Sequence, residues 1–179
     1  MPGIIRETHD QKARSGLRLG LRTADFLISI TILVCLCANP ACAAPGGPPR
    51  CMWLGGFNDI DLGTIADSQT TVTGASQCNL KANCDVELAA DNSIASRLTG
   101  PGGDFLLTEY ALSVNGGQAS PFTSCDSFLS PPVVFDYNGG DFGPWMQLEV
   151  SLHVRASNPP GEAANAGEYR ATQTLTAHW

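Results

Sequence analysis

The sequence is poor in the residues and spacings that catalytic and metal sites require. It has 3 histidines, and it contains no C-x-x-C pair, nucleophile elbow, phosphate-binding glycine loop or zinc-protease helix. The loop "FDYNGGDFG" could offer oxygen atoms of Asp136, Asn138 and Asp141 to calcium, but it lacks the later acidic ligand of an EF-hand. A hairpin turn explains its Asn-Gly-Gly. The sequence therefore predicts no enzyme, no cofactor and no metal site.

Basic residues are scarce beyond residue 43. Of 10 Lys and Arg, 5 precede residue 44, as do 3 of 17 Asp and Glu. The remainder holds 5 basic (10 − 5) and 14 acidic (17 − 3) residues, a net charge of −9. Nucleic acids and anionic membranes select for basic patches, so this balance argues against both as partners.

Residues 1–43 predict a secretory signal peptide. Five basic residues precede the apolar run "FLISITILVCLCA" (26–38), which is shorter than the roughly 20 residues that span a bilayer. Pro40 and the small residues of "ACA" follow it, as at a signal cleavage site. We expect cleavage before Ala44, with no membrane span afterwards; an uncleaved anchor is the alternative. Residues 44–50, rich in Pro and Gly, predict a flexible leader.

Four cysteines follow the predicted cleavage site. In an exported domain, four cysteines indicate two disulfides, for which three connectivities are possible. They are Cys51, Cys78, Cys84 and Cys125.

No stretch after the leader keeps a helical period over three turns, whereas period-two alternation is frequent. In "MQLEVSLHVR" (146–155) every second residue is apolar, and "NGG" occurs as a turn signal at Asn115 and Asn138. About seven short strands with Gly and Pro between them predict an antiparallel β-sandwich. The chain ends on one more such strand, "GEYRATQTLTAHW" (167–179). One side of it carries Tyr169, Ala171, Gln173, Leu175, Ala177 and Trp179.

The order of these segments resembles the spore coat protein U domain, a pilin-like family of archaic chaperone–usher fibres. The resemblance covers residues 51–179. It rests on the order of four segments: "CMWLGGFNDIDLGTI", "TVTGASQC", "DVELAADNSIASRLTGPGGDFLLTEYALSVNGG" and the closing "GEYRATQTLTAHW".

This resemblance implies an immunoglobulin-like sandwich that lacks its last strand. A periplasmic chaperone, and later a neighbouring fibre subunit delivered by the usher, would supply that strand by β-strand addition. The protein would pass through the periplasm to the cell surface. The acceptor groove would be lined by Tyr169, Ala171, Leu175, Ala177 and Trp179, with Gln173 at a groove end or hydrogen-bonded. The family's usual disulfide corresponds to Cys51–Cys78, which leaves Cys84–Cys125.

The leader departs from the family pattern, because residues 44–50 hold two glycines and three prolines and make a poor donor strand. We therefore expect a subunit that accepts a strand but offers none, as a terminal subunit would. The alternative function is a free secreted or periplasmic binding module. In that case Trp53, Phe57, Phe142 and Trp145 could line a sugar-binding face.

Overall fold

The computed structural model describes residues 24–29, 50–65, 71–140, 143–161 and 164–179. Within them the fold is nearly all β, as the sequence predicts, and its only helical segments are two single 3-10 turns, Ile94–Ser96 and Pro101–Gly103. No helix in these residues has the length and hydrophobicity to cross a membrane. The rest of the predicted signal peptide and most of the leader, including the cleavage site before Ala44, lie outside the described residues.

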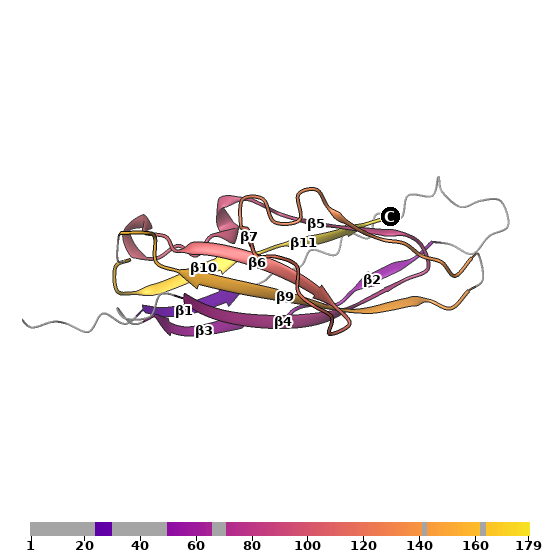
Figure 1. The fold of residues 1–179 in the computed structure, drawn as a ribbon, viewed down its shortest axis with the longest axis horizontal. Helices are drawn as coiled ribbons and strands as arrows, with labels where there is room; N and C mark the ends of the chain where they lie inside the picture. Colours follow the sequence, from indigo (N-terminus) through magenta and orange to yellow (C-terminus); the bar gives the residue numbers. More distant parts are fainter. Residues whose placement is uncertain (1–23, 30–49, 66–70, 141–142, 162–163) are drawn as a thin grey trace, which may run out of the picture.

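The largest sheet has five strands in the order β2-β4-β9-β6-β7, and all of its pairs are antiparallel. Its strands are β2 (Met52–Leu54), β4 (Thr71–Ala82), β9 (Met146–Ser157), β6 (Leu107–Val114) and β7 (Thr123–Ser124). β4 and β9 pair along their whole length, from Thr71↔Ser157 to Ala82↔Met146. These two long strands give the molecule its elongated shape (Figure 1).

Two three-stranded sheets complete the fold. One has the order β10-β1-β3, made of β10 (Glu168–Thr172), β1 (Ala24–Ser29) and β3 (Ile60–Ile65). The other has the order β11-β5-β8, made of β11 (Leu175–His178), β5 (Val86–Ala90) and β8 (Val133–Phe135). The predicted closing strand is thus interrupted at Gln173 and Thr174, and its two halves belong to different sheets.

One continuous apolar core joins the sheets. Its fully buried side chains include Leu80 of β4, Leu88 of β5, Leu152 of β9, Tyr169 of β10 and Leu175 of β11. The alternation predicted for residues 146–155 is confirmed over Val150, Leu152 and Val154, which are buried while the residues between them are partly exposed. In β6 the alternation breaks down, because Ala111 and Ser113 are buried as well as Tyr110 and Leu112.

The strand β1 is the main departure from the expected organisation. Its residues belong to the predicted signal peptide, yet they pair with strands from both ends of the described domain. An apolar segment fits a signal peptide and a sheet interior equally well, so composition does not separate the two uses.

Candidate functional site

The closing strand has one edge paired with the domain itself. β11 pairs antiparallel with β5, from Leu175↔Ala90 to His178↔Glu87. At the interruption, the amide of Asp91 donates to the Thr174 carbonyl at 2.8 Å, and on β10 Thr99 and Arg170 exchange hydrogen bonds of 3.0 and 3.1 Å. This side of the chain end is therefore paired along β11 and at one bridge on β10.

The other edge of β10 faces β1. These two strands are parallel, in register from Asp25↔Glu168 to Ser29↔Thr172. On its far side β1 pairs antiparallel with β3, from Ala24↔Ile65 to Ile28↔Ile60. We call the position between β3 and β10 the strand slot; Figure 1 shows β1 lying in it. The slot is one strand wide, and among the described residues β1 is the strand that pairs with both β3 and β10.

The residues predicted to line a groove point into the core. Tyr169 and Leu175 are fully buried, Ala171 and Ala177 are 4% and 6% exposed, and Trp179 is partly buried. Only Tyr169 and Ala171 lie on the strand that borders the slot; Leu175 and Ala177 lie on β11.

Gln173, the polar residue of this inward series, reaches hydrogen-bond partners as expected. Its Nε2 donates to the carbonyls of Asp91 and Thr174, both at 3.1 Å. Its buried Oε1 accepts no hydrogen bond from the described residues. The amide thus holds the interruption between β10 and β11 together at the point where the chain changes sheets.

The structure does not bring Cys51 and Cys78 together. In the β2–β4 ladder Met52 pairs with Ala82 and Leu54 with Leu80, so Cys51 lies beside Asn83. Cys78 lies five residues further along β4, roughly 16 Å away at about 3.3 Å per residue. A disulfide tolerates a Cα separation of about 7 Å at most. The predicted Cys51–Cys78 disulfide is therefore incompatible with this register.

The second predicted disulfide, Cys84–Cys125, meets the same obstacle. The Cys125 amide donates to the Thr108 carbonyl at 3.0 Å, and Thr108 pairs with Ala156 of β9. Cys84 follows Ala82, which pairs with Met146 at the opposite end of β9. Ten residues of strand correspond to about 33 Å, so these two thiols lie near opposite ends of the large sheet.

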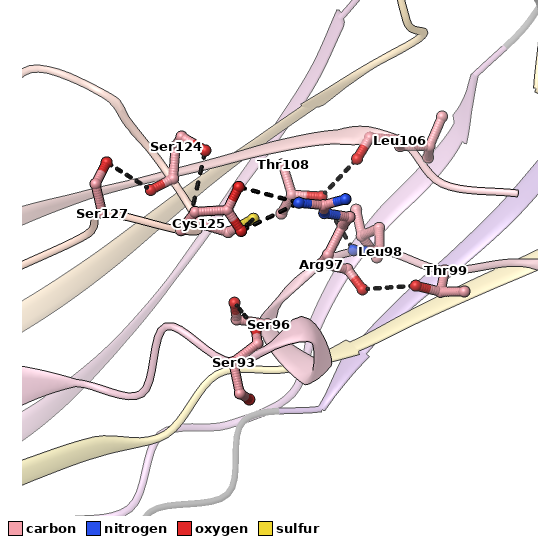
Figure 2. A network of polar contacts seen from close by, with 11 residues as sticks. Ser93, Ser96, Arg97, Leu98, Thr99, Leu106, Thr108, Ser124, Cys125 and Ser127 are labelled. Atoms are coloured by element: carbon pink, nitrogen blue, oxygen red, sulfur yellow. Dashed lines mark hydrogen bonds and ion pairs between the residues drawn. The ribbon is translucent and has the colours of Figure 1, made fainter. Parts of the chain in front are cut away.

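A polar cluster lies where the 3-10 turn Ile94–Ser96 meets β6 and β7 (Figure 2). The Nη2 atom of Arg97 donates to both carboxylate oxygens of Asp126, at 3.0 and 3.1 Å. Its Cζ atom lies 5.0 Å from the centroid of the Phe105 ring. Hydrogen bonds with Cys125 and Asp126 raise the pKa of Arg97. Residues 105–109 and 124–126 line with Arg97 an open pocket of about 250 Å³.

The cluster satisfies its own polar groups. The Leu98 amide donates to the Thr108 hydroxyl at 3.0 Å, and that hydroxyl donates to the Leu106 carbonyl. Arg97 is neutralised by Asp126, so no unpaired positive charge faces the pocket to attract an anion. The arrangement fastens the chain before β6 to the strand pair and offers no group poised for chemistry.

The aromatic residues predicted to line a sugar-binding face differ in their exposure. Phe57 is buried in the core, whereas Trp53 and Trp145 are 50% and 47% exposed. Asp141 and Phe142 lie outside the described residues. Among the residues that the structure describes, no group of three or more His, Cys, Asp or Glu side chains could hold a metal ion.

No model of a known protein family matches the chain, and no curated protein sequence is significantly similar to it.

Proposed function

We propose that the protein is an exported structural or adhesive subunit of a surface fibre, assembled by a chaperone–usher system. Its domain is an immunoglobulin-like sandwich that takes one strand from a partner. The observation that carries this proposal is the strand slot between β3 and β10, which is filled by Ala24–Ser29. That segment lies upstream of the predicted cleavage site, so signal removal would empty the slot.

An empty slot would lower the stability of the folded domain. Both β3 and β10 would lose their partner along a ladder of five residues each, and their backbone groups would need water or another strand. A periplasmic chaperone, and then a neighbouring subunit, would supply the strand by main-chain pairing with alternating apolar side chains.

The resemblance to the spore coat protein U domain agrees with this proposal, because that family accepts strands in the same way. With only 44–50 between the predicted cleavage site and Cys51, this chain would offer no donor strand of its own. We therefore place it at the end of a fibre, at the cell surface after transit through the periplasm, in a role that is structural and not catalytic.

The test is to produce the exported chain alone and together with periplasmic chaperones of this class. We expect soluble monomeric yield to depend on one chaperone and to rise at least several-fold in its presence. Ala171→Asp, at a buried position, should abolish the chaperone-dependent rise in yield. Arg170→Asp, at an exposed position, should keep this rise. A soluble monomer at equal yield without any chaperone would contradict the proposal.

A free secreted or periplasmic binding module is the second candidate. It is favoured by Trp53 and Trp145, two large aromatic side chains that remain about half exposed on a small domain. If they bind sugar, glycan addition should change tryptophan fluorescence, and Trp53→Ala should weaken the change. An unaltered spectrum across a glycan panel would remove this candidate.

A further inference from the structure

Cys51 and Cys84 lie next to each other at one end of the molecule, although they are far apart in sequence. The Asn83 amide donates to the Cys51 carbonyl at 3.1 Å, and the Cys51 amide donates to the Asn83 side chain at 2.6 Å. The Cys84 Sγ itself lies 3.9 Å from the Cys51 carbonyl oxygen. Two backbone-anchored contacts thus hold the start of the domain against the turn that contains Cys84.

We propose that Cys51 and Cys84 form a disulfide that ties the first residue of the domain to the turn after β4. The two S–H bonds are replaced by one S–S bond. The two protons and two electrons pass to a disulfide oxidant, either a thiol–disulfide oxidoreductase or oxidised glutathione, whose own S–S bond is reduced to two thiols. Among the three possible connectivities, this linkage differs from the one that the family resemblance implies.

The Cys84 thiol lies beside Cys51 and near two charged residues. Burial raises the pKa of the Cys84 thiol, Arg50 lowers it, and Asp85 and Cys51 raise it. Cys51 is partly exposed, so an oxidant can reach it and form the first mixed disulfide.

The other two cysteines are poorly placed to form a disulfide with Cys51 or Cys84. Cys78 lies on β4 five residues from Asn83, the residue beside Cys51, and burial raises the pKa of its thiol to about 12. Cys125 is 2% exposed at the far end of the large sheet. Neither can approach Cys51 or Cys84 without breaking the β4–β9 or β6–β9 pairing.

The test uses the purified chain treated with oxidised glutathione, so that its outcome is independent of export and of strand donation. After blocking of remaining thiols, trypsin cleaves after Arg50, Lys81 and Arg97, which separates 51–81 from 82–97. We expect these two peptides to be linked and Cys125 to be alkylated only after unfolding. Because 51–81 holds both Cys51 and Cys78, the linked species must persist in Cys78→Ser and vanish in Cys51→Ser.

A stability measurement accompanies the mapping. Reduction should lower the melting temperature by roughly 10 °C, because a closed loop of this size restricts the unfolded chain. Cys84→Ser should melt as the reduced protein does and be indifferent to reductant, whereas Cys78→Ser should keep its response. A linkage that vanishes in Cys78→Ser, a linkage to the peptide that holds Cys125, or an oxidised protein in which no linkage forms would overturn the proposal.

Discussion

Leu175 and Thr176 are adjacent on β11 but have opposite environments. Leu175 is fully buried in the core, and Thr176 points to the partly exposed face opposite Ala89. Leu175→Asp places a carboxylate among apolar side chains and should lower the free energy of unfolding by at least about 3 kcal/mol.

Thr176→Asp is the matched control, because it adds the same charge one residue away and should cost less than about 1 kcal/mol. Denaturant unfolding of both variants measures the difference. Equal losses would mean that the alternation of the closing strand does not decide its burial.

Cys78 supplies a residue-scale prediction about pH. Burial raises the pKa of its thiol from 9.0 to about 12, so the folded protein keeps a proton that the unfolded chain releases. The contribution of Cys78 to the free energy of unfolding is therefore fully present below about pH 9 and is lost as the pH rises towards 12. The free energy of unfolding falls by at most about 1.4 kcal/mol per pH unit from this group.

The measurement is denaturant unfolding between about pH 8.5 and 9.5, which stays below the ordinary tyrosine pKa of about 10. Cys78→Ala should flatten the slope even though its cavity lowers stability overall. A wild-type slope as flat as the variant's would show that Cys78 does not titrate as a buried thiol, as it would not if it were disulfide-bonded.

At the scale of elements, β3 packs closely on β4 at Gly74. A Cβ atom at Gly74 would lie 2.5 Å from Cγ2 of Ile60 and 2.7 Å from Cδ2 of Leu62. Gly74→Ala should therefore push β3 away and lower the free energy of unfolding by about 1–3 kcal/mol.

Gly56→Ala provides the comparison, since nothing lies within 4 Å of a Cβ atom there. It should leave stability within about 0.5 kcal/mol of the wild type in the same denaturant series. If Gly74→Ala were equally neutral, the contact between these two strands would be looser than described.

Strand positions were predictable where the two faces of a strand differ in environment. β9 has one buried face and one partly exposed face, so its apolar residues recur at every second position and the sequence predicts the strand. The sequence of β6 alternates as well, but two residues expected to face outward, Ala111 and Ser113, are buried. The interruption of the closing strand at Gln173 was not predicted, although a glutamine in an apolar series was its one visible sign.

At the scale of the molecule, pairing between distant segments is what the sequence leaves open. The predicted disulfides disagree with the register of β2 against β4 and with the ends of β9 that the thiols approach, neither of which the sequence specifies. Alternation defines the face of a residue but not its position along a neighbouring strand. The same holds for Ala24–Ser29, whose place between β3 and β10 depends on two strands remote in sequence.

We expect β3 and β10 to stay fully protected only while a strand fills the slot between them. Amide hydrogen exchange tests it directly, by comparing a chain that begins at Ala24 with one that begins at Ala44. We expect residues 60–65 and 168–172 to exchange far faster in the shorter chain, or that chain to self-associate. A synthetic peptide with the sequence of residues 24–34 should restore protection, while Val150–Val154 of β9 serves as the internal reference. A monomeric shorter chain with undiminished protection of both segments, unaffected by the peptide, would contradict the account.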